Sequence, residues 1–240
     1  MDVSLHDKII KESEYIKKFW VGLMDGDGSI QVNHWRKKTL QYRLIIKLKY
    51  CPENVSMLKL ISENIGGQVR ILKDNTFVIW AVNTRESVRK ILQIFTIYPP
   101  LTSRLRAQVK FMLDCLNHNN VEKYLKLRNN KYIIRDTSVE IIDNYINEWL
   151  SGFIEAEGSF SIRKNGYHSF SIGQNDDKYL IEIIKSHFNI QSKVRNPYKQ
   201  FWCIETYRIL TLHNIITHFN KYPLLGEKLV SLNNFKIHMK

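Results

Sequence analysis

Cysteine and long apolar runs are scarce in this 240-residue chain, and each scarcity excludes a class of protein. Cys51, Cys115 and Cys203 lie far apart, and no Cys-x-x-Cys or Cys/His spacing suggests a zinc site. Three cysteines cannot supply a full disulfide framework, so we expect ordinary buried thiols in a reducing compartment. No apolar run reaches the length of a membrane span, and the charged N-terminal stretch has no signal-peptide core. We therefore expect no membrane partner.

Acidic side chains are also in short supply. The chain has 36 Lys and Arg against 23 Asp and Glu, which gives a net charge of +13 and a pI of about 9.6. This excess favours a polyanionic partner such as nucleic acid, although a Lys-rich surface that only aids solubility is the alternative. The hydrophobic content of 44% predicts a globular fold of one large or two small domains, with a sizeable core.

Alanine occurs only three times, whereas Lys, Ile and Asn occur 24, 30 and 20 times. The abundant residues have AT-rich codons, which indicates an AT-rich genome. We therefore expect an organelle-encoded protein, mitochondrial in the first instance, with another organelle as the alternative. This is a coding bias and gives no physical argument about function.

Two helical stretches 130 residues apart share one pattern. Apolar residues recur at i, i+3, i+4, i+7 and i+8, the spacing of one helical face. They are Ile16, Phe19, Trp20, Leu23 and Met24 in the first stretch, and Ile146, Trp149, Leu150, Phe153 and Ile154 in the second. The match continues without gaps, so that Gly22 aligns with Gly152, Gly26 with Ala156 and Asp27 with Glu157. The chain therefore contains an internal repeat.

The segments after each stretch also correspond. Alternating apolar and polar residues in "SIQVN" and "SFSIRK" predict strands, and "YRLIIKLKY" and "YHSFSIGQN" predict a second strand in each half. A helix, two more strands and a last helix follow in both. We predict an α+β fold of two pseudo-symmetric αββαββα halves with two antiparallel sheets. The halves are residues 14–118 and 144–240, and residues 119–143 are the linker.

Small residues lie four apart in both helical stretches. Gly22 and Gly26, like Gly152 and Ala156, fall on one face of their helix. Small residues at this spacing let two backbones approach closely, so we expect the two helices to pack against each other. A glycine near a helix end can also be a simple C-cap. That explains Gly28 and Gly158, but it leaves the two glycines inside the helices unexplained.

Both helices end on carboxylates, where the helix dipole disfavours negative charge by roughly 0.3–1 kcal/mol. Two such carboxylates brought together repel further. A compensating cation is therefore expected between Asp27 and Glu157, and oxygen ligands without His or Cys suit Mg²⁺. A calcium loop starting at Asp25 is excluded, because its sixth and twelfth positions are Ile30 and Arg36. A plain Asp-Gly turn would explain one half but not the repeat.

The two motifs "WVGLMDGDG" (20–28) and "LSGFIEAEG" (150–158) resemble those of the LAGLIDADG homing endonucleases. Two copies in one chain imply the single-chain, pseudo-symmetric form, a monomer, and the resemblance covers about 14–118 and 144–240. The first copy departs from the pattern by opening on Trp20 in place of Leu. This position packs in the core, so the departure does not affect the expected chemistry.

The resemblance implies roles for particular residues. The eighth motif position binds metal, which is Asp27 and Glu157 here, and the seventh offers its main-chain carbonyl, which is Gly26 and Ala156. Asp25 and Glu155 are expected to point elsewhere. The repeat aligns Arg104 with Lys228, and the family often has basic residues at these positions near the metals. Gln174 resembles a water-positioning polar residue; its counterpart lies near Leu48 or Lys49, of which Lys49 is favoured.

Basic and polar residues are concentrated in the predicted strands and turns. No acid occurs in 28–52, 158–175 or 183–204. A twisted sheet with such a face can lie in a DNA major groove, where Lys and Arg bind phosphates and Arg, Gln and Asn read base edges. A solvated strand face is the alternative for any one residue. The expected DNA contacts are Gln31, Asn33, Arg36, Lys37, Gln41, Arg43, Lys47, Arg70, Ser161, Arg163, Asn165, His168, Lys193, Arg195, Asn196, Lys199 and Gln200.

The sequence therefore favours a site-specific homing endonuclease that breaks both strands of a long, asymmetric double-stranded DNA site and supports intron mobility. We expect Mg²⁺ as the cofactor, Mn²⁺ as a substitute, and Ca²⁺ to bind without supporting cleavage. The alternative is an intron RNA maturase, alone or in addition to cleavage. A DNA-binding regulator or inert remnant of the same family is a third hypothesis, and the intact acids argue against it.

Overall fold

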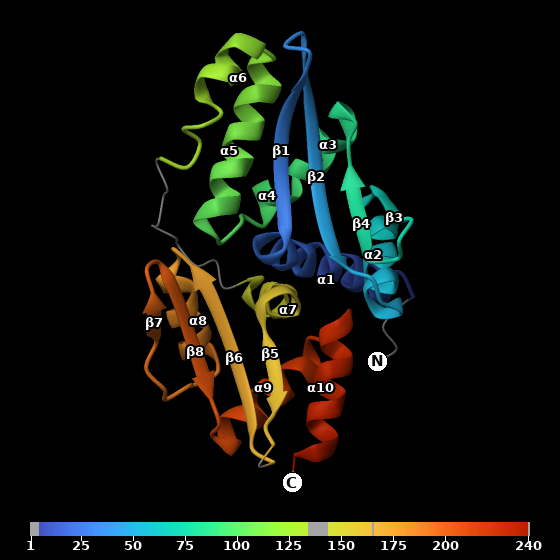
Figure 1. Cartoon of the computed structure of the whole chain (residues 1–240). Helices are drawn as coiled ribbons and strands as arrows, with labels where there is room; N and C mark the ends of the chain where they lie inside the picture. Colours follow the sequence, from blue (N-terminus) through green and yellow to red (C-terminus); the bar gives the residue numbers. More distant parts are fainter. Residues whose placement is uncertain (1–4, 134–143, 165, 240) are drawn as a thin grey trace.

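The computed structural model describes residues 5–133, 144–164 and 166–239, and two similar halves meet along one pair of helices (Figure 1). These helices are α1 (Leu5–Gly26) and α7 (Ile146–Glu157), which pack side by side at the junction. Each half contains a four-stranded antiparallel sheet within the described residues. The predicted α+β architecture, with the motif helices at the interface, is confirmed.

The first half forms its sheet in the order β1-β2-β4-β3. Helices cover one face of this sheet and continue beyond it to α6. The elements after α1 are β1 (Gly28–Trp35), β2 (Thr39–Lys49), α2 (Pro52–Ile65), β3 (Gln68–Ile71), β4 (Phe77–Val82), α3 (Arg85–Leu92), α4 (Ile94–Ile97), α5 (Ser103–His118) and α6 (Val121–Leu127).

The second half repeats this arrangement with the strand order β5-β6-β8-β7. The elements after α7 are β5 (Ser159–Ile162), β6 (His168–Asn175), α8 (Lys178–His187), β7 (Arg195–Tyr198), β8 (Phe201–Thr206), α9 (Ile209–Lys221) and α10 (Glu227–His238). Core residues of the two halves form one continuous cluster that runs through α1 and α7.

Each half continues past the helix that the sequence predicts as its last. The expected last helix ends before "YPPLTS" or "YPLLGE", and a new helix, α5 or α10, begins after it. Proline cannot continue a helix, so Pro99, Pro100 and Pro223 separate the two segments. Part of the predicted linker is also structured. Tyr124 of α6 is buried, and its hydroxyl donates to the Val32 carbonyl of β1 at 2.9 Å.

The first helix has 22 residues and starts nine residues before the predicted boundary at residue 14. At about 1.5 Å per residue it has the length of a bilayer, but charged side chains occur along it. None of the helices in the described ranges combines the length and the apolar character that crossing a membrane requires.

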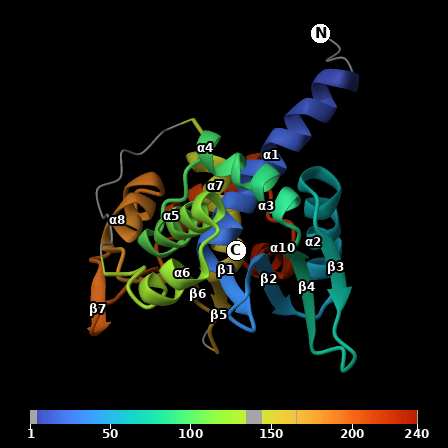
Figure 2. The same ribbon diagram turned by 90° about the horizontal axis from the view of Figure 1, so that it is seen from above.

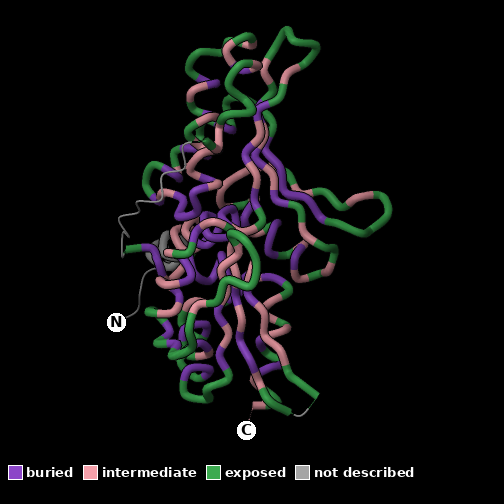
Figure 3. Tube along the Cα trace, turned by 60° about the vertical axis from the view of Figure 1, so that its left-hand side comes forward, coloured by how far each residue is buried: buried purple, intermediate pink, exposed green. Residues whose placement is uncertain are grey.

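The two faces of each sheet differ because strand side chains alternate. In β2, Tyr42, Leu44 and Ile46 are buried against the helices, whereas Arg43 and Lys47 lie on the opposite face. Figure 2 shows the strands of both sheets toward one side of the molecule, with α1 and α7 behind them. Figure 3 shows the buried trace running through the sheets and the junction, with exposed segments at the hairpin ends. The two open sheet faces therefore share one side.

The junction depends on glycines inside both helices. A Cβ added at Gly22 would lie 2.0 Å from the Trp149 carbonyl oxygen, and one added at Gly152 would lie 1.9 Å from the Phe19 carbonyl oxygen. The backbones therefore touch where any side chain would keep them apart. The predicted close packing of the small-residue faces is confirmed.

Replacing Gly152 by alanine tests this contact. Inside a helix this change ordinarily favours folding by about 0.5–1 kcal/mol, because glycine loses more backbone entropy. Here the methyl group collides with the backbone of α1, so we expect Gly152→Ala to lower the free energy of unfolding by at least about 2 kcal/mol. Urea denaturation measures the difference, with Ser56→Ala on the exposed face of α2 as the control. Unchanged or increased stability of Gly152→Ala would contradict the packing.

Candidate active site

Two carboxylates emerge side by side at the junction, from the ends of α1 and α7. Asp27 directly follows α1, and Glu157 is the last residue of α7. A Cβ added at Gly26 would lie 2.2 Å from the Ala156 Cβ and 3.6 Å from Glu157 Oε1. The glycine packing therefore brings Asp27 and Glu157 together, one from each half.

The earlier acid of the first motif has a structural role. Asp25 is fully buried and accepts hydrogen bonds from the backbone N–H of Leu101 at 2.8 Å and of Thr102 at 2.9 Å. It also accepts from the Trp149 indole Nε1 at 2.7 Å. Asp25 thus holds the segment that begins α5 and links the two halves.

Glu155 has the matching role in the second half. It is buried and accepts from the backbone N–H of Leu225 at 3.1 Å, Gly226 at 3.1 Å and Lys228 at 2.9 Å. It therefore caps the start of α10. As the sequence predicts, Asp25 and Glu155 point away from the acid pair.

Arg104 lies at the C-terminal end of α1. Its guanidinium donates to the carbonyls of Gly28 at 2.7 Å, Asp25 at 2.6 Å and Gly26 at 3.1 Å. This positive charge offsets the negative end of the helix dipole next to Asp27. The Gly26 carbonyl therefore already accepts one hydrogen bond, and only its second lone pair is left for another partner.

The protein environment makes both site carboxylates harder to ionise. Desolvation by surrounding protein raises the pKa of Asp27, while the charges of Lys228 and Arg104 oppose the rise. Desolvation and the neighbouring charge of Asp27 both raise the pKa of Glu157, again opposed by Arg104 and Lys228. Mutual repulsion of this kind requires closely spaced carboxylates and is relieved when a cation binds between them.

A small open pocket of about 210 Å³ lies beside Asp27. The main-chain and side-chain atoms of both halves line it, including Lys49 and Asn54 from the first half and Ala156 and Lys228 from the second. The structure thus brings Asp27, Lys49 and Lys228 to one pocket. In the described part of the chain no three His, Cys, Asp or Glu side chains gather as a metal centre. A divalent ion at the acid pair would need carbonyl, water or phosphate ligands as well.

The strand register corrects the expected counterpart of Gln174. Ser29 pairs with Ile45 in the first sheet, and its equivalent Ser159 pairs with Ser171 in the second. Counting three residues onward from each partner matches Gln174 with Leu48. Lys49 corresponds to Asn175 and lies on the open face of its sheet, so the expected equivalence of Lys49 and Gln174 is wrong.

The first sheet presents a basic open face. Arg43 is half-buried, its Nε makes no hydrogen bond to described residues, and the Lys47 ammonium lies 3.9 Å from the Phe77 ring centroid. A hollow of about 630 Å³ at the outer part of this half is lined by Asn33, Gln41 and Arg43, among others. The candidates on this face or at its β1–β2 turn are Gln31, Asn33, Arg36, Lys37, Gln41, Arg43, Lys47 and Arg70.

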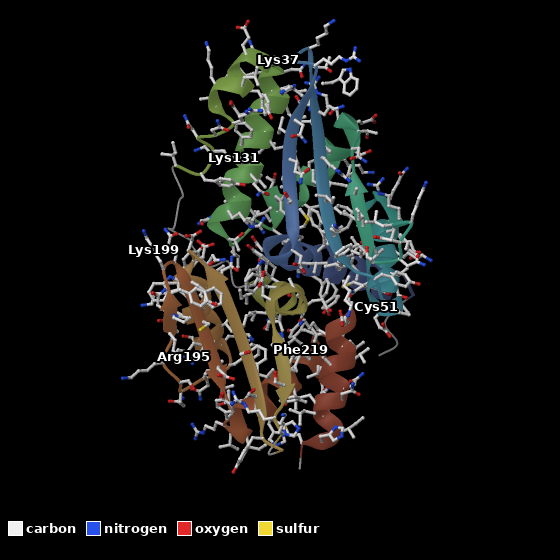
Figure 4. The ribbon with its side chains drawn as sticks, viewed as in Figure 1. Lys37, Cys51, Lys131, Arg195, Lys199 and Phe219 are labelled. Atoms are coloured by element: carbon white, nitrogen blue, oxygen red, sulfur yellow. The ribbon has the colours of Figure 1, made fainter. Side chains whose placement is uncertain are left out.

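The second sheet presents less free positive charge. Glu205, on β8, accepts from Arg163 at 3.0 Å and from Arg195 at 3.1 Å. These two expected DNA contacts are therefore paired within the protein. Figure 4 shows Arg195 and Lys199 on the β7 side of this sheet and Lys37 at the far tip of the other half. The remaining exposed candidates of this half are Ser161, Lys193, Asn196, Lys199 and Gln200; of these, Ser161 is only partly exposed.

One of the expected DNA contacts, His168, is not available on these faces. The His168 side chain packs on the helix side of its sheet, with its ring centroid 4.8 Å from that of Phe235 in α10. Its expected role as a DNA contact is therefore wrong, because strand alternation turns it toward the core. Asn165 lies outside the described residues.

Sequence reasoning missed Asn54, Asp177 and Glu205. Asn54 lines the pocket beside Asp27, and Asp177 is buried at the start of α8. A polar residue at the start of the second helix of each half was the only available signal. Asn54 and Asp177 contact Glu227 and Ser103 in the opposite half of the chain, and Glu205 contacts Arg163 and Arg195 from other segments of its own half, so sequence spacing could not identify them.

Two basic sheets on one side and a pair of acids at their junction are the features of a pseudo-symmetric enzyme that acts on nucleic acid. The chain belongs to the LAGLIDADG endonuclease family, whose model matches residues 20–115 and 150–239. Both motifs occur in one chain, as expected for the single-chain form. The family uses divalent metals.

Curated relatives are similar along most of the chain. The probable intron-encoded endonuclease aI3 of Debaryomyces hansenii is 46% identical over 97% of this chain, which spans 39% of that protein. The protein of the same description from Dictyostelium citrinum is also 46% identical, over 94% of this chain and 96% of its own length. The chain thus spans about two fifths of one relative and nearly all of the other.

Solved structures share the fold. The LAGLIDADG homing endonuclease I-LtrWI bound to target DNA has a TM-score of 0.76 and 24% identity, over 94% of this chain and 89% of that one. I-SmaMI bound to an uncleaved DNA target in the presence of calcium ions has a TM-score of 0.72 and 19% identity, over 92% and 90%. At this level of identity the likeness concerns the fold.

The two acids of the first motif should differ in their effect on stability. Asp25→Ala leaves buried N–H groups without an acceptor, so we expect it to lower the free energy of unfolding by about 3 kcal/mol or more. Asp27→Ala should leave it unchanged or raise it, because it removes a disfavoured charge. Urea denaturation compares them, and Asp25→Asn, which keeps one acceptor oxygen, should fall between. Equal losses for both alanine variants would contradict these assignments.

The raised pKa values of the acid pair predict a pH-dependent stability difference. A carboxyl group whose pKa is raised by folding does not lower the free energy of unfolding at pH values below its unfolded pKa of about 4. It lowers that free energy most at pH values above its folded pKa. Without metal, Asp27→Asn/Glu157→Gln should therefore melt at least about 2 °C above the unsubstituted protein at pH 7.5. The difference should shrink as the pH falls toward about 4. Thermal unfolding in EDTA tests this, and a difference that grows at lower pH would refute it.

Proposed function

We propose that this protein is a site-specific homing endonuclease that makes a metal-dependent double-strand break in a long, asymmetric DNA site and so supports intron mobility. The observation that carries the proposal is the pairing of Asp27 and Glu157 at the junction of two sheets whose open faces share one side. One carboxylate from each pseudo-symmetric half suits a substrate with two antiparallel strands.

The two open sheet faces would bind the DNA on either side of the acid pair. Sheets of this kind fit the major groove, where phosphate contacts set the register and side chains read base edges. The first sheet carries cations such as Arg43, Lys47 and Arg70, which form no ion pair with the residues that the structure describes, whereas Glu205 neutralises part of the second. Different side chains on the two faces support an asymmetric target and a single bound monomer.

The acid pair fits a hard divalent ion. Asp27 and Glu157 supply carboxylate oxygens, and main-chain carbonyls of Gly26 and Ala156 lie at the same helix ends. Mg²⁺ prefers such ligands and completes its shell with water and substrate phosphates, so we expect Mg²⁺, with Mn²⁺ as a substitute and Ca²⁺ as a non-productive ligand. When bound, such an ion activates water and stabilises the charge on the leaving oxygen of the scissile phosphate.

The surrounding side chains would complete the site. Lys228 and Arg104 place positive charge beside the acids, as their effects on the Asp27 and Glu157 pKa values indicate. This charge favours a phosphate that becomes more negative during the reaction. Lys49 lines the pocket of Asp27, where it is suited to hold water or phosphate oxygens. Gln174, the next-to-last residue of β6, would have the same role in the other half. We assign one catalytic site to each DNA strand. Because one site acid is Asp27 and the other is Glu157, we expect the two DNA strands to be cleaved at unequal rates.

The relatives also support a setting for this activity. Both curated relatives described above are named as probable intron-encoded endonucleases. Together with the codon bias of the sequence, this supports an organelle-encoded protein that acts in mitochondria.

Replacement of both site acids tests the proposal. The protein and its Asp27→Asn/Glu157→Gln variant are incubated with intron-free organellar DNA from candidate hosts in Mg²⁺, and new ends are sequenced. We expect one discrete break by the unsubstituted protein and a loss of at least about a thousandfold in the variant. In Ca²⁺ both should bind the site without cutting.

Glu86→Gln, at an exposed acid of α3, is the matched control and should cut normally. A variant that lacks both site acids and still cuts at the same place would refute the proposed site. No cleavage together with tight binding of the protein's own intron RNA would instead favour the maturase hypothesis.

A further inference from the structure

Asn54 connects the two cationic segments beside Asp27. It is buried in the first turn of α2, and its amide nitrogen donates to the Lys49 carbonyl at 3.0 Å. Its amide oxygen accepts from the backbone N–H of Glu227 at 3.0 Å. Asn54 therefore joins the end of β2, in its own half, to the start of α10 in the other half.

The start of α10 is held from both halves. Glu155 belongs to the same half and accepts from the Lys228 N–H. Asn54 belongs to the other half and accepts from the Glu227 N–H. A Cβ added at Gly226 would lie 2.7 Å from both acceptor oxygens, so the helix start fits closely between them. Lys228 follows directly on this clamped turn, lines the pocket of Asp27 and has its charge close enough to lower the Asp27 pKa against desolvation.

Asp177 makes the corresponding contact for the other cation. It is 1% exposed, and its Oδ2 accepts from the Ser103 N–H of the opposite half at 2.9 Å. Asp25, from the same half as α5, accepts from the preceding Thr102 N–H. Arg104 follows directly on this second clamped turn.

Both clamps lie at the junction. Figure 1 shows α2 beside the first turn of α10, and α8 close to the N-terminal end of α5. Cys51, which precedes α2, lies near the top of α10 in Figure 4. The two clamps thus act on corresponding helix starts, those of α10 and α5, although Asn54 lies in the first turn of α2 whereas Asp177 directly precedes α8. One clamp uses a neutral amide and the other a carboxyl group.

We propose that Asn54 and Asp177 are positioning residues that hold Lys228 and Arg104 in their sites across the interface between the halves. This deepens the proposed function and rests on it. Neither residue needs to touch DNA or metal; each fixes the helix turn from which the cation projects. Loss of one clamp therefore impairs the site that uses that cation more than the other site, whereas a general loss of stability would affect both.

Strand-resolved cleavage tests the proposal. The rates at which the two strands of the target are nicked in Mg²⁺ are measured for Asn54→Ala and Asp177→Ala, with Lys228→Met and Arg104→Met as references. We expect Asn54→Ala to slow, by about fivefold, the strand that Lys228→Met slows most, as the loss of one helix cap implies. Asp177→Ala should do the same for the strand that Arg104→Met slows most. DNA affinity in Ca²⁺ should stay unchanged.

The chain offers matched controls. Asn64→Ala removes another amide of α2, which among the described residues bonds within its own helix to the Leu60 carbonyl, and should leave both rates unchanged. Asp177→Asn keeps an acceptor oxygen for the Ser103 N–H and should restore the rate. If an alanine variant does not fold, Asn54→Leu and Asp177→Leu replace the pair, because leucine fills a similar volume but offers no acceptor to the Glu227 or Ser103 N–H. Asn54→Leu should slow the same strand as Lys228→Met.

Equal slowing of both strands, or no slowing, would overturn the positioning role while leaving the endonuclease intact. If the unsubstituted protein made no metal-dependent break, or if Asp27→Asn/Glu157→Gln still cut, the proposed function itself would fail, and this inference with it.

Discussion

The backbone contact between α1 and α7 is the constraint on which the rest of the structure depends. Gly22 and Gly152 let each helix touch a carbonyl oxygen of the other, at a separation that leaves no room for a methyl group. This contact joins the two cores into one, brings Asp27 and Glu157 together and turns both sheets toward the same side. The spacing of the acids is therefore a consequence of helix packing.

The same contact places two carboxylates close together, and nearby cations offset part of their negative charge. Two carboxylates at the C-terminal ends of two helices are disfavoured by the helix dipoles, by desolvation and by each other. Arg104 bonds the last carbonyls of α1, and Lys228 lies beside Asp27. Their effects on the Asp27 and Glu157 pKa values are opposed by desolvation, which keeps both values raised. A divalent ion bound between Asp27 and Glu157 would therefore relieve the repulsion between the two carboxylates.

Sequence reasoning succeeded where the relevant information is local or repeated. The internal repeat predicted the glycine packing and the strand pattern, and the family resemblance predicted the different directions of Asp25 and Asp27. It failed where position depends on register or on the opposite half: Leu48, not Lys49, matches Gln174, and His168 faces α10. Glu205 pairs with Arg163 and Arg195 because three strand segments converge, which charge counts along the chain do not show. Asn54 and Asp177 likewise act on helices more than 70 residues away.

Direct binding of a divalent ion to the acid pair is the most decisive measurement. Mn²⁺ can be titrated into the protein and into Asp27→Asn/Glu157→Gln while the free-ion signal is followed by electron paramagnetic resonance. We expect the unsubstituted protein to remove Mn²⁺ from solution and Mg²⁺ to compete for the same sites, whereas the variant should bind little. Equal Mn²⁺ binding by the two proteins would contradict a metal site built from one carboxylate of each half.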